Sequence, residues 1–155
     1  MGHVRYSGHV DGTEEAAWDL VTRSALYPEW DPLFCRVTPP AMPLDRPGAS
    51  IDAVLRMAGR QISGHVEVAA AEPPDRLLLV GVAGEDVRLT WTWRVARLGR
   101  GIEVSVELDY ELAEHIAGDV ADLVFVERAV GRGVRAAVEN LADLVQVRQP
   151  VLVDS

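Results

Sequence analysis

The amino-acid sequence predicts an α+β fold in which a curved antiparallel sheet grips one long C-terminal helix. Apolar and polar residues alternate with a period of two through most of residues 50–112, which is typical of half-buried antiparallel strands. Within residues 88–95, for example, Trp91 and Trp93 share the apolar face. The apolar face of the sheet needs a cover, and the Ala-, Val- and Leu-rich stretch 119–147 is the segment long enough to provide it.

One strand and two short helices are expected before this region. Residues 4–10 alternate as a first strand. Thr13 is a good N-cap for a first helix, because its hydroxyl can accept a backbone N–H that has no partner inside the helix. A second helix is expected over residues 25–30. Pro28 and Pro32 keep it short, because proline cannot continue a helix from within.

Six further strands and the long helix complete the predicted order, so the sheet has seven strands. Glycine-containing segments at 58–60, 84–85 and 98–101 are typical of hairpin turns between consecutive strands. A chain of 155 residues suits one domain, which we place at residues 1–148. Residues 149–155 are expected to be a C-terminal tail.

Several features bear on location. No apolar run approaches the roughly 20 residues that a membrane-spanning helix needs. The N-terminal residues lack the apolar core of a signal peptide. The one cysteine, Cys35, cannot form an internal disulfide, which agrees with a reducing compartment. We therefore expect a cytoplasmic protein with no membrane span.

Charge and residue usage exclude several function classes. The formal net charge of −9, without any basic run, argues against a nucleic-acid partner. All 15 basic residues are Arg, so neither a Schiff-base lysine nor a P-loop lysine is present. The four histidines do not have the spacing of metal ligands, and we expect no metal and no cofactor. These histidines are His3, His9, His65 and His115.

The long helix carries an apolar stripe that is expected to face the sheet. At 100° per residue the stripe contains Val120, Leu123, Val130, Val134, Val138, Leu141 and Val145. Glu127 falls in the middle of this stripe, and Gly131 lies beside it one turn later. This pattern predicts a polar anchor next to an unfilled space. The alternative is that Glu127 reaches solvent or pairs with an Arg, while Gly131 only lets the helix bend or pack closely.

Large apolar and aromatic side chains are the other candidates for lining an internal pocket. Their flat faces suit a polycyclic or acyl ligand, and Trp and Tyr each add one hydrogen-bond donor. Some of them are alternatively ordinary core residues. Trp30 is expected at the pocket entrance. The candidates are Tyr6, Trp30, Leu55, Met57, Trp91, Trp93 and Tyr110.

The order of elements and four short motifs resemble a known family. The motifs are TEEAAWDL at 13–20, YPEWDP at 27–32, PGAS at 47–50 and EPPDRL at 72–77. Together they resemble the polyketide cyclase/dehydrase group of the START-like, Bet v 1-like superfamily (SRPBCC). The resemblance implies the helix-grip fold, with two short helices after the first strand and a C-terminal helix that encloses an apolar cavity.

The resemblance does not imply one chemistry, because members include lipid carriers, hormone binders, aromatase/cyclases, co-chaperone domains and antibiotic self-resistance proteins. We expect binding of a hydrophobic small molecule such as a polyketide, a lipid or a related secondary metabolite. The alternatives are a cyclase, in which Glu127 or Tyr110 moves a proton during aldol cyclisation or dehydration, and self-resistance by sequestration. A protein-interaction module is a third possibility. The sequence leaves open whether the chain is a monomer or a homodimer.

Overall fold

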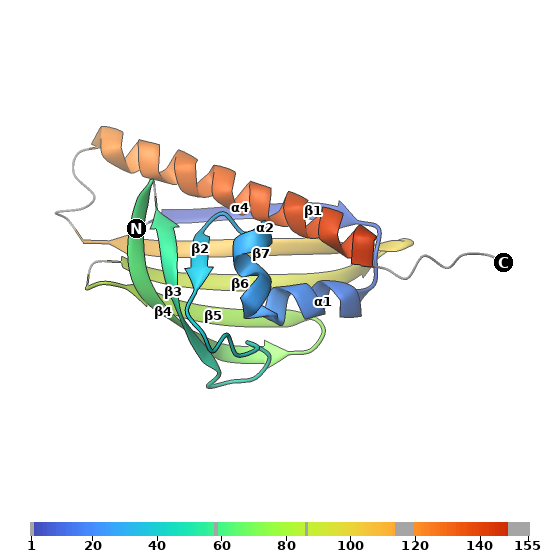
Figure 1. Cartoon of the computed structure of the whole chain (residues 1–155). Helices are drawn as coiled ribbons and strands as arrows, with labels where there is room; N and C mark the ends of the chain where they lie inside the picture. Colours follow the sequence, from blue (N-terminus) through green and yellow to red (C-terminus); the bar gives the residue numbers. More distant parts are fainter. Residues whose placement is uncertain (1, 58, 86, 114–119, 149–155) are drawn as a thin grey trace.

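The computed structural model describes residues 2–57, 59–85, 87–113 and 120–148, and in the last helix it describes the side chains of residues 124–146. The predicted helix-grip architecture is confirmed (Figure 1). A seven-stranded antiparallel sheet curves beneath a long C-terminal helix, and short helices follow the first strand. The strand order across the sheet is β1-β7-β6-β5-β4-β3-β2. The strands are β1 (Gly2–Val10), β2 (Phe34–Val37), β3 (Ser50–Met57), β4 (Arg60–Glu72), β5 (Arg76–Ala83), β6 (Val87–Leu98) and β7 (Gly101–Leu112).

The helices are α1 (Glu14–Thr22), a short 3₁₀ helix (Ser24–Leu26), α2 (Tyr27–Trp30) and α4 (Val120–Arg148). The second short helix, expected over residues 25–30, is thus a 3₁₀ turn followed by a single α-helical turn. The long helix has nearly its predicted bounds. No helix among the described residues is long and apolar enough to cross a membrane.

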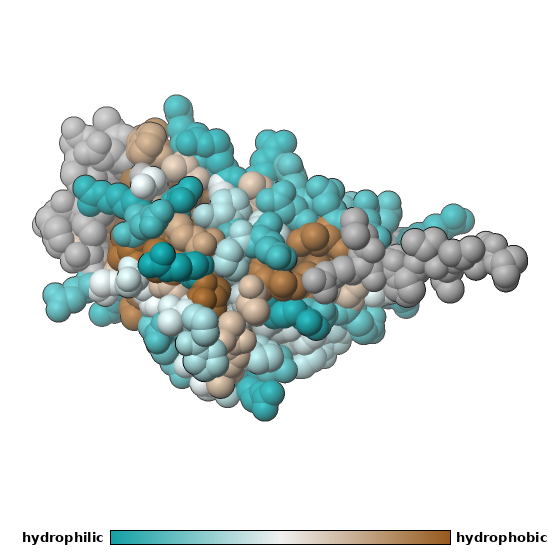
Figure 2. Space-filling model, in the orientation of Figure 1, coloured by the Kyte–Doolittle hydropathy of each residue, from teal (hydrophilic) through white to brown (hydrophobic). Residues whose placement is uncertain are grey.

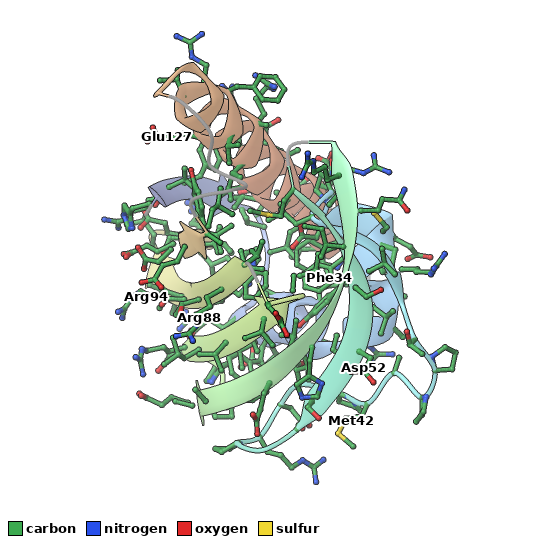
Figure 3. The ribbon with its side chains drawn as sticks, turned by 90° about the vertical axis from the view of Figure 1, so that its left-hand side faces the viewer. Phe34, Met42, Asp52, Arg88, Arg94 and Glu127 are labelled. Carbon is green, nitrogen blue, oxygen red and sulfur yellow. The ribbon has the colours of Figure 1, made fainter. Side chains whose placement is uncertain are left out.

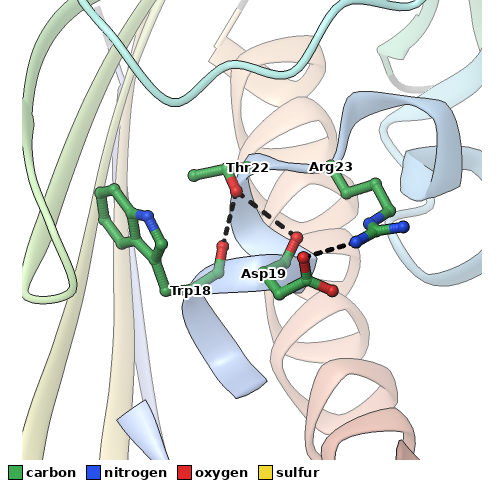
Figure 4. A network of polar contacts seen from close by, with 4 residues as sticks. All are labelled: Trp18, Asp19, Thr22 and Arg23. Carbon is green, nitrogen blue, oxygen red and sulfur yellow. Dashed lines mark hydrogen bonds and ion pairs between the residues drawn. The ribbon is translucent and has the colours of Figure 1, made fainter. Parts of the chain in front are cut away.

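Local hydrogen bonds hold both ends of α1. The Thr13 hydroxyl accepts the backbone N–H of Ala16 at 3.1 Å, which confirms the predicted N-cap. At the other end, the Thr22 hydroxyl donates to the backbone carbonyl of Trp18 at 2.8 Å, and Arg23 pairs with Asp19 at 2.6 Å (Figure 4). The end of α1 is therefore fixed where the chain turns toward α2.

The curvature of the sheet separates an apolar inner face from a polar outer face. Trp91 and Trp93 are buried on β6, and their register partners on β7, Leu108 and Val106, are buried as well. Figure 3 shows that Phe34 points to the inside of the curve. Register shifts interrupt the β2–β3 and β4–β5 ladders, and such irregularities bend strands. The core therefore lies in the concavity of the sheet.

The apolar stripe on α4 is confirmed from Val130 to Val145. Val130, Val134, Val138, Leu141 and Val145 are all buried. The side chains of Val120 and Leu123, which the prediction also included, lie outside the described residues.

The helix α4 packs mainly along β1 (Figure 1). At Gly8 of β1, a Cβ atom would lie only 3.0 Å from Cγ1 of Val138. The missing side chain at Gly8 therefore allows the close approach of the helix to the first strand.

Candidate functional site

Five aromatic side chains meet on the inner side of the sheet. The rings of Trp30 and Trp93 lie 5.5 Å apart, and those of Trp91 and Phe34 lie 5.8 Å apart. Tyr27 connects the two pairs, with its ring 5.6 Å from Trp30 and 4.8 Å from Phe34. All five are buried. We call these residues, from α2, β2 and β6, the aromatic cluster.

A glycine on the neighbouring strand makes room for one member of the cluster. Gly81 lies on the inner face of β5, where a Cβ atom would be 2.9 Å from Cζ3 of Trp91 and 3.4 Å from Cγ2 of Val66. The benzo ring of Trp91 therefore occupies the space that a side chain at position 81 would need. Sequence analysis did not single out Gly81, although a lone glycine inside an alternating strand is a signal for such a close approach.

Two polar atoms in the cluster have no hydrogen-bond partner among the residues that the structure describes. They are the indole nitrogens Nε1 of Trp30 and Trp91, and both are fully buried. Most buried N–H groups in proteins have a partner, so an unpaired one calls for an explanation. The cluster therefore offers two unused donors in an otherwise apolar environment.

Trp30 lies deeper than expected. We expected it at the pocket entrance, but only 1% of it is exposed. The reason is that α2 is a single turn folded against the core, and it holds Trp30 between the rings of Tyr27 and Trp93. The backbone carbonyl of Trp30 also accepts a hydrogen bond from Nδ2 of Asn140 at 3.0 Å, which ties α2 to α4.

Asp31 is a buried carboxyl group that sequence analysis did not identify as a candidate. It ends α2, and its Oδ1 accepts the backbone N–H of Leu33 at 3.0 Å. Burial raises the pKa of the Asp31 carboxyl to about 7, although the hydrogen bond from Leu33 acts in the opposite direction. A usable signal was its position between Trp30 and the Pro32-Leu33 pair, because apolar neighbours on both sides favour burial of this segment.

The hydroxyl group of Tyr27 is already engaged. It donates a hydrogen bond to the backbone carbonyl of Val21 at the end of α1. Burial, and after it the charge of Asp31, raises the pKa of the Tyr27 hydroxyl far above its usual value. Tyr27 therefore stays neutral and serves to connect α1 and α2.

Glu127 does not point toward the sheet as expected. Its side chain is exposed, and Figure 3 shows it on the outside of α4. Glu127 has the same angular position on the helix as the buried stripe, but Figure 1 shows α4 diverging from the sheet toward its N-terminal end. Among the described side chains, the stripe is buried from Val130 onward. The alternative in which Glu127 reaches solvent fits this placement.

Glu127 nevertheless acts on Tyr110. Tyr110 is buried on β7, and its ring lies where a side chain at Gly2 would otherwise be. Burial is the first cause that raises the pKa of the Tyr110 hydroxyl, and the negative charge of Glu127 is the second. The two residues proposed from the sequence for proton transfer are thus electrostatically linked, while their catalytic role stays a prediction.

The charge of Glu127 is therefore expected to be measurable at Tyr110. We expect Glu127→Gln to lower the pKa of Tyr110, which stays above its usual value because burial is the larger cause. The free energy of unfolding should change by less than about 0.5 kcal/mol, because the side chain is exposed. An NMR titration of the Tyr110 Cζ resonance measures the pKa. Glu111→Gln, on the outer face, is the control, and an equal effect of both substitutions would contradict the link.

The remaining candidates occupy different parts of the inner face. Leu55 and Met57 are buried on β3, and Leu55 is the register partner of Phe34. Tyr6 is half-buried between β1 and α4, where Cζ of Arg135 lies 5.8 Å from its ring centre. Gly131 is also at this boundary: a Cβ atom there would be 3.9 Å from Cγ1 of Val4. The structure thus places Trp30, Trp91 and Trp93 in one cluster and Tyr6 and Gly131 beside β1. The role of all these residues in ligand binding stays a prediction.

Three of the histidines lie on the outside of the described chain. His3 pairs with Asp109 at 2.6 Å, His65 with Asp52 at 2.8 Å, and His9 with Asp11 at 3.4 Å. These pairs are exposed, and His115 lies outside the described residues. Among the residues that the structure describes, no group of three potential metal ligands occurs.

A comparison with models of protein families shows which family this chain belongs to. Residues 1–146 match the model of the family described as "Polyketide cyclase / dehydrase and lipid transport". The chain belongs to this family. A search of curated proteins found no match. The family resemblance inferred from the sequence motifs is therefore confirmed.

Solved structures show the same fold at low sequence identity. A START superfamily protein from Mycobacterium smegmatis is 16% identical with a TM-score of 0.67, and the match covers 95% of this chain and 99% of that one. Two di-domain ARO/CYC proteins each have a TM-score of 0.72. StfQ, from the steffimycin biosynthetic pathway, is 13% identical, with 94% of this chain and 51% of that chain covered. BexL, from the BE-7585A biosynthetic pathway, is 19% identical, with 94% and 50% covered.

Proposed function

We propose that this member of the polyketide cyclase/dehydrase and lipid transport family binds a hydrophobic small molecule on the inner side of its sheet. The ligand belongs to the class of polyketides, lipids or related secondary metabolites, and it contacts the aromatic cluster. The observation that carries the proposal is the cluster itself, a set of five buried rings with two N–H donors that no group among the described residues accepts from. Family membership supports the same conclusion.

The outer surface supports an internal ligand over a protein partner. On the face seen in Figure 2, apolar areas are small and separated by hydrophilic ones. A protein-interaction module needs a contiguous exposed apolar patch. Among the described residues, the large apolar side chains that are exposed lie in the loop before β3, on β5, on β6 and on α4: Met42, Val80, Val82, Leu98, Val124 and Phe125.

A cyclase or aromatase activity is the second candidate function. The observation that favours it is the buried hydroxyl of Tyr110 on β7, which stays protonated because burial, and after it the charge of Glu127, raises its pKa, and which can therefore donate a proton to a bound polyketone. The ARO/CYC names of two structural neighbours agree with this candidate. In an enzyme, Glu127→Gln should reduce turnover while ligand affinity is kept. Self-resistance by sequestration needs only binding of the small molecule. A cytoplasmic location suits each of these functions.

Native mass spectrometry of the purified chain tests the primary proposal. We expect a co-purifying apolar molecule that leaves when the chain is denatured. A titration with the neutral fluorescent probe N-phenyl-1-naphthylamine then measures the affinity of the chain for an apolar compound. The absence of both a co-purifying molecule and saturable probe binding would contradict the proposal.

A substitution at Gly131 tests where the ligand lies relative to α4. We expect Gly131→Leu to weaken probe binding by at least about tenfold while the chain stays folded, because a leucine fills space beside the helix. Gln146→Leu adds an apolar side chain on the exposed part of the same helix and should leave the affinity unchanged. Unchanged affinity in folded Gly131→Leu would show that the ligand does not reach this part of α4.

A further inference from the structure

The two unpartnered indole groups carry information about the ligand itself. An indole Nε1–H can donate a hydrogen bond but cannot accept one. Leaving such a donor buried without a partner destabilises the folded state. The described chain leaves two of them, at Trp30 and Trp91, both in the aromatic cluster.

Both donors belong to the same site. Trp30 comes from α2 and Trp91 from β6, so they approach the aromatic cluster from two different elements. Their rings are connected through those of Tyr27 and Phe34, with centroid distances of 4.8–5.8 Å at each step. The Tyr27 hydroxyl is occupied by the carbonyl of Val21. The indole donors are therefore free to meet a bound molecule.

A weaker explanation is that each indole N–H points onto a neighbouring aromatic face. This geometry is open to Trp30, because its ring plane is at 85° to Tyr27 and at 75° to Trp93. Trp91 finds no such face in its contact with Phe34, because the two rings are stacked with an interplanar angle of 29°. In a stacked pair the N–H lies in the plane of its own ring and points past the partner. Trp91 is therefore the more informative donor.

We propose that Nε1 of Trp30 and Nε1 of Trp91 bind oxygen acceptors of the ligand. The two indoles act as specificity-determining groups that favour an oxygenated ring system, with ketone, quinone or ether oxygens, over a hydrocarbon or a plain acyl chain of similar size. This proposal rests on the proposed function, because it assigns the ligand class of that same site.

Two matched probes test the proposal. 9-Fluorenone carries one carbonyl group on the same fused-ring frame as fluorene, which has none. We expect the wild-type chain to bind fluorenone about tenfold more tightly than fluorene, the difference that one added hydrogen bond produces. Fluorenone should also move the indole N–H resonance of Trp91, Trp30 or both downfield in a ¹⁵N–¹H spectrum, while fluorene should not.

Phenylalanine variants identify the donors. Trp30→Phe and Trp91→Phe each keep an aromatic ring and remove the N–H, and we expect the preference for fluorenone to fall to about twofold or less in at least one of them. Trp18→Phe makes the same change on α1, outside the aromatic cluster, and its preference should stay near tenfold. If a variant does not fold, the proposal is tested by the indole N–H resonances of the wild-type chain alone.

The outcomes separate this proposal from the proposed function. Equal affinity of the two probes, together with indole resonances that fluorenone does not move, would overturn the oxygen-binding role and leave apolar binding intact. A preference that survives in both Trp30→Phe and Trp91→Phe would overturn it as well. If neither probe binds and no apolar molecule co-purifies, both the oxygen-binding role and the proposed function are wrong.

Discussion

Replacing Asp31 with asparagine is expected to stabilise the chain by several kcal/mol at pH 8. The wild-type carboxyl has its pKa raised by burial from 3.8 to about 7, which means that the folded state favours the protonated form. Above pH 7 the folded chain must carry a buried negative charge, whereas the unfolded chain carries the same charge in water. Asparagine avoids this cost and keeps an oxygen for the backbone N–H of Leu33.

The pH dependence has a definite sign. Below about pH 4 the carboxyl is protonated in both states, so the two proteins should differ little. Between pH 4 and pH 7 the unfolded wild-type chain releases a proton that the folded chain keeps, and wild-type stability falls as the pH rises. The advantage of Asp31→Asn should therefore grow across this interval and level off above pH 7.

Urea unfolding at half-unit steps from pH 4 to pH 8 measures this difference. Asp143→Asn removes the same charge from an exposed position on α4 and is the matched control, with an expected effect within about 0.5 kcal/mol. An advantage of Asp31→Asn that does not change with pH would show that the Asp31 carboxyl ionises normally in the folded chain.

Trp91→Ala is expected to lower the free energy of unfolding by about 3–5 kcal/mol. Only 1% of Trp91 is exposed, and its ring fills the space over Gly81 and stacks on Phe34. Removing the ring leaves a cavity that the surrounding strands of a continuous sheet cannot close. Chemical denaturation with a tryptophan-independent signal, such as far-ultraviolet circular dichroism, measures the loss.

Trp18→Ala provides the comparison for this prediction. Trp18 lies on α1, where it is only half-buried (Figure 4). Its removal should cost less than half as much as the removal of Trp91. Equal losses for the two substitutions would mean that Trp91 is not part of a tightly packed core.

The sheet and the long helix could be predicted because their burial is periodic. Alternation places Trp91 and Trp93 on the same side of β6, and both are buried as expected. The stripe from Val130 to Val145 follows the helical period, and its members are buried in the structure. In both elements a single apolar face packs against the core, so the pattern of residues shows which face of the strand or helix is buried.

The site could be predicted only in part because it depends on how elements meet. Periodicity places Glu127 on the inner stripe, but it does not show that α4 diverges from the sheet at that point. The single turn of α2 is too short to have a period, so neither the depth of Trp30 nor the burial of Asp31 follows from the pattern. These positions result from tertiary packing between α2, β6 and α4.

The central claim, that an apolar ligand lies among the aromatic cluster, can be tested with the two phenylalanines of this chain. Phe34 belongs to the cluster, whereas Phe125 is 57% exposed on α4. Chain labelled with 4-fluorophenylalanine gives one ¹⁹F resonance for each, and Phe125→Leu assigns them. On titration with N-phenyl-1-naphthylamine, we predict that the Phe34 resonance shifts and saturates with the affinity seen by fluorescence, while the Phe125 resonance does not move. A shift of Phe125 with no shift of Phe34 would place the probe on the outer surface and contradict the account.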